Sequence, residues 1–144
     1  MTNQSDSIIL IGPMGSGKTS TGRILAKEMG FDFLDTDEEV VERTGVSIAY
    51  IFDVEGETGF RQREHHALMK FLDNDNVVIA TGGGIITHDE SRAIIKSHKR
   101  VVYLKTSIEK QTERATASDK RPLLIDTDER KPSEIALEII DRLR

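Results

Sequence analysis

A glycine-rich stretch near the start of the chain, "GPMGSGKT" at residues 12–19, constrains the fold more than any other feature. It fits the pattern G-x-x-x-x-G-K-[ST] at every position, and in this pattern successive backbone N–H groups curl around a phosphate. The apolar run "SIILIG" leads into it, and a helical pattern follows over residues 18–29. Because a strand before and a helix after are the context that such a loop requires, the stretch predicts a phosphate-binding loop.

The residue types in this loop indicate what it binds. Lys18 is expected to reach the β- and γ-phosphates, and the Thr19 hydroxyl is expected to coordinate Mg²⁺. A chance glycine turn is the alternative, but it would not need a strand and a helix in these positions. We therefore predict a nucleoside triphosphate, with ATP as the first choice, as one ligand.

The rest of the chain alternates apolar runs with helical patterns. Strands are expected within residues 7–12, 31–37, 76–84, 100–106 and 123–127. Helices are expected over residues 18–29, 38–43, 47 to about 56, 57–72, 89–98, 107–117 and from 132 onward. This alternation predicts an α/β fold with a parallel sheet, and 144 residues suit one domain.

Composition excludes several classes of function. The net charge is −5 and the sequence pI is about 5.4, and no basic stripe is visible, so nucleic acid is not expected as a partner. The chain has no Cys, which excludes disulfides and thiolate metal sites. No apolar run has the length of a membrane span, and the start "MTNQSD" does not resemble a signal peptide, so we expect a cytoplasmic protein. The four His residues show no zinc spacing, and we expect them at the surface.

Two acids, Asp35 and Asp37, end the second predicted strand. Ligands of open parallel sheets lie beyond the carboxyl ends of the strands, so these acids are expected near the phosphates. One carboxylate could hold Mg²⁺ through water, and the other could accept a proton from a hydroxyl group. Capping of the next helix by Asp37 explains the spacing equally well.

The helix predicted over residues 57–72 carries a charged pair on its apolar side. With Phe60 at 0°, Arg61 falls at about 100° and Glu64 at about 40°, inside the arc of apolar residues. A buried Arg needs a partner, because an unpaired buried charge is costly. The pair is either structural, or Glu64 orients Arg61 so that its fork can hold a substrate carboxylate.

Two further stretches are weaker signals on their own. The glycines of "TGGG", Gly82, Gly83 and Gly84, would let a ligand touch the backbone, although a flexible turn is the alternative. Arg114 and Arg121 flank the polar segment "ATASDK", and they are either transition-state arginines on a mobile loop or a solvated charge run.

Taken together, the sequence resembles the shikimate kinases. The matching pieces are "GPMGSGKTSTGR", "LDTD", "RTGVSIAYIFDVEGETGFRQRE", "ATGGG", "VVYL" and "RPLL", in the family's order from about residue 8 to residue 124. The resemblance implies a nucleoside-monophosphate-kinase-like fold with a five-stranded parallel sheet in the order 2-3-1-4-5. It also implies transfer of the γ-phosphoryl group of MgATP to the 3-hydroxyl of shikimate, a step of aromatic amino acid biosynthesis, by a monomer.

On the nucleotide side, the resemblance carries over to three groups of residues. The residues that would wrap the phosphates are Gly15, Ser16, Gly17, Lys18, Thr19 and Ser20. Arg121 matches the lid arginine at the transferring phosphate, and Asp35 matches an acid near the metal that Thr19 binds. The residues that fall where the family lines the adenine pocket are Arg114, Arg130 and Pro132.

On the acceptor side, the resemblance includes the acid at Asp37 and the arginine at Arg61, which the residue patterns also indicate. Asp37 matches the acid that binds the shikimate hydroxyls and assists the attack. Arg61 matches the carboxylate clamp, and the helices over about residues 37–72 would form the substrate-binding region. Gly83 matches a backbone contact to the substrate, and we include its neighbours Gly82 and Gly84 in the expected site.

The chain departs from the family after "RPLL", in the predicted lid region at about residues 115–124. The family has a further segment there, with an Arg that is a second carboxylate clamp, whereas Ile125 follows Leu124 at once. If Arg121 lies in a lid at the carboxyl edge, the chain must return to the amino edge before Ile125. Four extended steps cover about 13–14 Å, which is too short for a crossover. We therefore expect Leu124 and Ile125 not to be covalently joined, with an omitted segment between them.

The alternative geometry is a return crossover made by the helix over residues 107–117, which would leave Arg121 at the amino edge and no lid. Two other functions also remain open. A gluconate-type kinase would share the phosphate loop without needing "GFRQRE" or "TGGG" in these positions. A nucleotide-binding module without turnover would fit a true deletion after Leu124.

Overall fold

The computed structural model describes residues 6–105 and 123–143. Five parallel strands form one sheet in the order β2-β3-β1-β4-β5. The strands are β1 (Ile8–Ile11), β2 (Asp32–Asp35), β3 (Val77–Ala80), β4 (Val101–Lys105) and β5 (Leu123–Asp126). The helices are α1 (Lys18–Met29), α2 (Thr36–Thr44), α3 (Ile48–Leu72), the 3₁₀ turn η1 (Ile85–Thr87), α4 (Asp89–Ser97) and α6 (Pro132–Leu143). The predicted fold class and strand order are confirmed.

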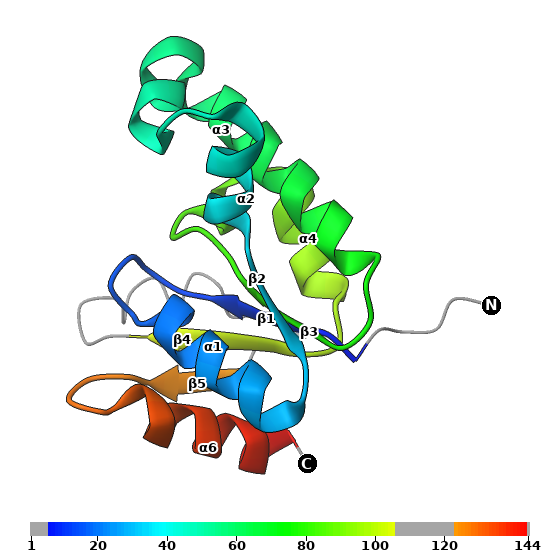
Figure 1. The fold of residues 1–144 in the computed structure, drawn as a ribbon, viewed down its shortest axis with the longest axis vertical. Helices are drawn as coiled ribbons and strands as arrows, with labels where there is room; N and C mark the ends of the chain where they lie inside the picture. Colours follow the sequence, from blue (N-terminus) through cyan, green and yellow to red (C-terminus); the bar gives the residue numbers. More distant parts are fainter. Residues whose placement is uncertain (1–5, 106–122, 144) are drawn as a thin grey trace.

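The central strand β1 is buried on both faces, as expected for a parallel sheet between two layers of helices. Ile8 and Leu10 belong to the apolar core shared with α1 and α6, whereas Ile9 and Ile11 belong to the core shared with α3 and α4. Figure 1 shows these two pairs of helices on opposite sides of the sheet. None of the helices in the described part of the chain is both long and apolar enough to cross a membrane.

The predicted helix ends agree with the structure where glycine sets them. Gly30 ends α1 with a φ of 72°, and its N–H donates to the carbonyls of Ala26 and Lys27. Gly45 ends α2 in the same way, with a φ of 73°. The short turn η1 between β3 and α4 was not predicted, because three residues carry no periodic signal.

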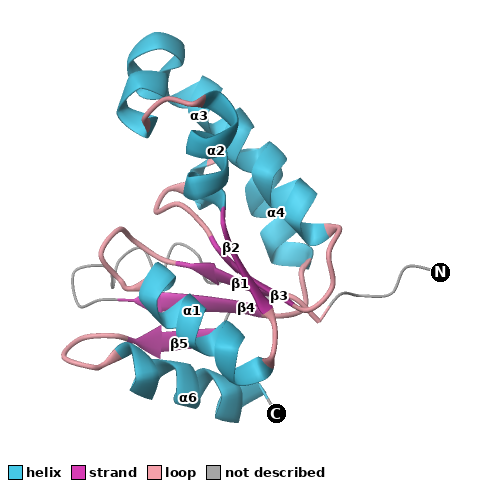
Figure 2. Cartoon of the chain, viewed as in Figure 1, coloured by secondary structure: helices cyan, strands magenta, loops and turns pink. Residues whose placement is uncertain are grey.

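The helices α2 and α3 extend beyond the sheet, at the top of Figure 1 and Figure 2. A separate small core joins them, formed by Val40, Ile51, Phe60 and Ala67. Within α3 the backbone is not helical at Gly56, where φ is 74° and ψ is −179°. The break lies between the two helices that the sequence predicts before and after this glycine.

The expectation that Leu124 and Ile125 are not joined is wrong. The strand β5 runs through both residues, and they pair with the consecutive residues Tyr103 and Leu104 of β4. Since β4 and β5 are parallel and Leu123 pairs with Val102, the return to the amino edge is complete before Leu123. No crossover therefore follows Leu124, and the alternative crossover over residues 107–117 lies outside the described residues.

Candidate active site

The phosphate loop connects β1 to α1 and is shaped by glycine. Gly15 and Gly17 have φ angles of 84° and 87°, a region that residues with a side chain rarely adopt. Gly17 is also the N-cap of α1, so the loop ends at the positive end of the helix. Thr19 and Ser20 are exposed, which leaves the mouth of the loop accessible.

Lys18 folds back over this loop. Its Nζ donates to the carbonyl oxygens of Gly12, at 2.6 Å, and Pro13, at 2.9 Å. Burial lowers the pKa of Lys18, while the negative charges of Asp37, Asp35 and Glu64 act in the opposite direction. The ammonium group thus lies between the loop carbonyls and a group of acids, and a phosphate would replace weak carbonyl partners with a charged one.

Asp35 links the loop to the acceptor region. One carboxylate oxygen accepts a hydrogen bond from the Thr19 hydroxyl at 3.0 Å, and the other accepts from the N–H groups of Asp37 and Glu38 at 2.8 and 3.1 Å. The N-cap of α2 is therefore Asp35, and the interpretation of Asp37 as a cap is wrong. This leaves the Asp37 carboxylate available for another role.

The oxygen atoms of Thr19 and Asp35 fit a hard cation. Mg²⁺ is commonly held by one or two protein oxygens together with phosphate oxygens and water. The described residues contain no cluster of three or more acids or histidines able to hold a metal alone. This arrangement is compatible with a Mg²⁺ ion that arrives with a nucleotide.

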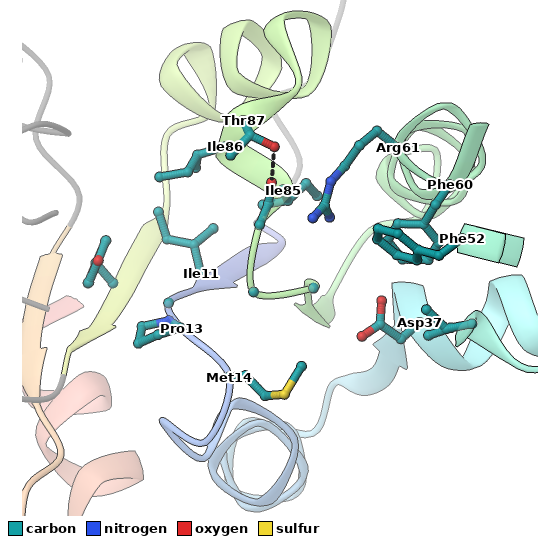
Figure 3. A pocket seen from close by; sticks show the side chains of 16 residues that line it. Ile11, Pro13, Met14, Asp37, Phe52, Phe60, Arg61, Ile85, Ile86 and Thr87 are labelled. Atoms are coloured by element: carbon teal, nitrogen blue, oxygen red, sulfur yellow. Dashed lines mark hydrogen bonds between the residues drawn. The ribbon is translucent and has the colours of Figure 1, made fainter. Parts of the chain in front are cut away.

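A cavity of about 560 Å³ lies beside the phosphate loop (Figure 3). It brings together the predicted acceptor residues from separate elements: Asp37 from α2, Arg61 from α3, and the Gly82–Gly84 turn after β3. The phosphate loop contributes Gly12, Pro13 and Met14 to the same cavity. Among the described residues that line it, Arg61 is the single cationic side chain.

Asp37 points into this cavity from the start of α2, as Figure 3 shows. Its Oδ1 is buried and has no hydrogen-bond partner within the described chain. Burial raises the pKa of Asp37, and the charge of Asp35 adds to this, against the opposing charges of Lys18 and Arg61. A carboxylate with a raised pKa and a free oxygen is suited to accept a proton.

Arg61 and Glu64 form the predicted pair, with 2.9 Å between Nη1 and Oε1. The Glu64 side chain is completely buried, and the Arg61 side chain is 13% exposed and also contacts Glu57 at 3.4 Å. The guanidinium lies 5.1 Å from the ring centroid of Phe60, within cation–π range. Burial raises the pKa of Glu64 to about 7, outweighing the hydrogen bond and charge of Arg61. The predicted pair is therefore present, and Arg61 also borders the cavity, so both interpretations of the pair stay open.

The remaining predicted site residues are those expected on the nucleotide side. Arg114 and Arg121 are outside the described residues. Arg130 donates to the carbonyl of Asp126 at 3.0 Å and forms an ion pair with Glu138 at 2.6 Å, and Pro132 begins α6. Their roles at a nucleotide stay predictions.

Sequence reasoning missed the apolar walls of the cavity. These are formed by Ile11, Ile48, Phe52, Phe60, Ile85, Ile86 and Tyr103. A signal existed for Phe60, which lies within the apolar arc on α3, but its position was attributed to the core. The expectation for the histidines was also wrong in part. His65 donates to or accepts from Ser91 at 2.9 Å, with its side chain 15% exposed, and His98 contacts the Ser7 carbonyl at 2.7 Å.

Comparison with known proteins agrees with this geometry. A family model described as shikimate kinase matches residues 14–143. The chain belongs to the shikimate kinase family. It is 41% identical to a shikimate kinase from Pseudomonas paraeruginosa, with 96% of each chain covered. It is 48% identical to one from Legionella pneumophila, over 82% of this chain and 67% of that one.

A solved structure extends the comparison to the fold of the shikimate kinases. The chain superimposes on a shikimate kinase from Acinetobacter baumannii in complex with shikimate, with a TM-score of 0.83, 34% identity, and 96% and 93% of the two chains covered. The alignment with the Pseudomonas relative spans 165 positions, more than the 144 residues of this chain. That relative therefore contains residues that have no counterpart in this chain.

Proposed function

We propose that this chain transfers the γ-phosphoryl group of ATP to the 3-hydroxyl of shikimate. The observation that carries the proposal is the single cavity in which Asp37, Arg61 and the Gly82–Gly84 turn border the phosphate loop. A hydroxylated carboxylic acid needs an anion clamp, a proton acceptor and a phosphoryl donor within one space, and these residues provide that set of groups.

On the acceptor side, Arg61 is proposed to bind the shikimate carboxylate through its guanidinium fork. Asp37 is proposed to hold the substrate hydroxyls and to take the proton as the hydroxyl oxygen attacks. The Gly82–Gly84 turn leaves room for the substrate to approach the backbone. The apolar walls keep water from competing with the hydroxyl group for the phosphoryl group.

On the donor side, the backbone of residues 15–20 is proposed to wrap the phosphates, and Lys18 is proposed to move from its loop carbonyls to the β- and γ-phosphates. Thr19 and Asp35, the latter through water, would hold Mg²⁺, which neutralises charge on the phosphates when bound. The roles of Arg114 and Arg121 rest on the resemblance alone. Catalysis in this scheme comes from positioning and charge stabilisation.

The test is consumption of ATP measured with a coupled assay, with shikimate, with other hydroxy acids such as gluconate, and with no acceptor. We expect ATP to be consumed with shikimate only, and shikimate 3-phosphate to appear in equal amount. Consumption of ATP with gluconate, and not with shikimate, would indicate a gluconate-type kinase. Binding of ATP without turnover for any acceptor would indicate a nucleotide-binding module.

The proposal includes the working form of the protein. A monomeric cytoplasmic enzyme is proposed, in line with the resemblance to the shikimate kinases and with two small soluble substrates. Analytical sedimentation at the assay concentration measures the oligomeric state. For a monomer, the activity per enzyme molecule should not change with protein concentration.

A further inference from the structure

The three consecutive glycines of the Gly82–Gly84 turn are not required by the backbone conformation. None of them is among the glycines with positive φ in the described chain. Gly84 has a φ of −111° and a ψ of 20°, which residues with a side chain also adopt. What excludes a side chain from this turn is the set of atoms that it would meet.

At Gly84, the neighbour is the guanidinium of Arg61. A Cβ atom at Gly84 would overlap Nη2 of Arg61 and lie 2.9 Å from its Cζ. On its other side, Arg61 is held by Glu64. The bare backbone at Gly84 is therefore the surface on which the guanidinium rests, as Arg61 in Figure 3 points toward this turn.

At Gly82, the neighbours are the two acids of the cavity. A Cβ atom there would overlap Oε2 of Glu64 and lie 2.9 Å from Oδ1 of Asp37. Both carboxylate oxygens are buried, so neither can move into solvent to make room.

At Gly83, the neighbour is the phosphate loop itself. A Cβ atom would lie 3.0 Å from the backbone nitrogen of Met14 and 3.6 Å from the carbonyl carbon of Pro13. The contact is to backbone, which cannot rotate away as a side chain can. One turn thus touches three different parts of the site through three successive residues.

We propose that each glycine of this turn is a positioning residue for a different functional group: Gly82 for Asp37 and Glu64, Gly83 for the phosphate loop, and Gly84 for Arg61. The substrate assignment in the test rests on the proposed function, but the contacts do not. The proposal adds a steric role to any backbone contact that the turn makes with the substrate.

Gly84→Ala gives the sharpest test, because its backbone accepts alanine and the atom displaced is the end of a flexible side chain. We expect the KM for shikimate to rise about tenfold, the lower range for loss of one charge-assisted hydrogen bond. The kcat, the KM for ATP and the melting temperature are expected to stay close to the parent values. Gly83→Ala is expected to show the opposite pattern, with the KM for ATP raised several-fold and the KM for shikimate retained.

Gln62→Ala is the matched control, since Gln62 directly follows Arg61 on α3 and its side chain is exposed. It should leave both KM values within about twofold of the parent. A double-mutant cycle identifies the route of the Gly84 effect. If Gly84 acts through Arg61, adding Gly84→Ala to Arg61→Ala should raise the KM for shikimate no further. An equal rise in both backgrounds would overturn the assignment of Gly84 to Arg61.

A readout without substrate separates this proposal from the proposed function. The NMR signal of the Arg61 Nε–H group should shift in Gly84→Ala and stay in place in Gln62→Ala. If the parent consumes no ATP with shikimate, the proposed function fails while this comparison still decides the role of Gly84. An unchanged Arg61 signal in folded Gly84→Ala would overturn the positioning role, whatever the activity.

Discussion

The phosphate loop and the Gly82–Gly84 turn are both rich in glycine, but for different physical reasons. Gly15 and Gly17 have positive φ angles and meet nothing closer than 3.7 Å where a Cβ would stand, so they serve the backbone conformation. The Gly82–Gly84 turn has ordinary φ angles and is crowded by Asp37, Glu64, Met14 and Arg61. The first segment shapes a site for any nucleotide, whereas the second fits one set of side chains around an acceptor.

The largest expected effect is on the phosphate loop. Lys18→Ala should lower phosphoryl transfer by about a thousandfold or more, the scale on which a cation at the transferring group acts. The fold should be retained, because Lys18 bonds to loop carbonyls and not to the apolar core. Single-turnover kinetics and circular dichroism measure the two effects. Retained turnover would contradict the assignment of the loop.

Asp37→Asn should break the acceptor region alone. The amide cannot accept the hydroxyl proton, and a loss in kcat of about 10²–10⁴ is expected for a missing general base. Calorimetric titration with ATP should give an affinity close to that of the parent. An equal loss in ATP affinity would show that the two regions do not act separately.

Glu64 provides a pH test of how tightly the acceptor turn is packed. Its pKa of about 7 in the folded chain lies above its ordinary value of 4.5, so the folded chain retains a proton that the unfolded chain releases. The resulting stability is complete below pH 4.5 and is lost as the pH rises through 7, by up to about 3 kcal/mol.

Glu64→Gln has no titrating proton at this position. The free energy of unfolding of the variant minus that of the parent should therefore increase between about pH 5 and pH 8. Urea unfolding of both proteins at several pH values measures the difference. A difference that does not change with pH would mean that Glu64 stays ionised beside Arg61.

Arg61→Ala should reduce acceptor affinity and leave the nucleotide site intact. Loss of a charge-assisted hydrogen bond is worth roughly 1.5–3 kcal/mol, or about ten- to a hundredfold in binding. Titration with shikimate compares the variant with the parent, and titration with ATP is the control. Unchanged shikimate affinity would leave Arg61 as only the structural partner of Glu64.

The smallest effect concerns the two kinds of glycine directly. Gly17→Ala places a side chain at a φ of 87° and should cost about 1–2 kcal/mol of stability through backbone strain. Gly84→Ala, at a φ of −111°, should cost little. Thermal unfolding of both variants measures the contrast. Equal losses of stability in the two variants would contradict the view that backbone strain acts at the phosphate loop and side-chain crowding at the Gly82–Gly84 turn.

The parts of the molecule that the sequence predicted are those with local signals. The phosphate loop has a fixed spacing, α1 has a glycine cap, and the position of Arg61 and Glu64 follows from the helical period. These features depend on neighbours within a few residues along the chain.

The features that could not be predicted depend on packing between distant segments. The spacing offered Asp37 as the cap of α2, whereas Asp35 caps the helix through the N–H groups of Asp37 and Glu38 and also binds Thr19 on another element. The crowding of the Gly82–Gly84 turn likewise comes from α2, α3 and the phosphate loop. The expectation about Leu124 failed because the resemblance was given more weight than the chain length available before β5.

The central place of β1 has a consequence for how the chain folds as it is synthesised. Ile8 pairs with Val78, and Ile9 pairs with Val101. β1 is therefore synthesised first but can pair only after residues far along the chain have been made. The Thr81 hydroxyl, which donates to the Leu10 carbonyl at 2.7 Å, also arrives late. Such long-range pairing slows folding and leaves an apolar strand edge exposed meanwhile. During synthesis the phosphate-loop segment is therefore made long before the strands that it needs to form a nucleotide-binding site.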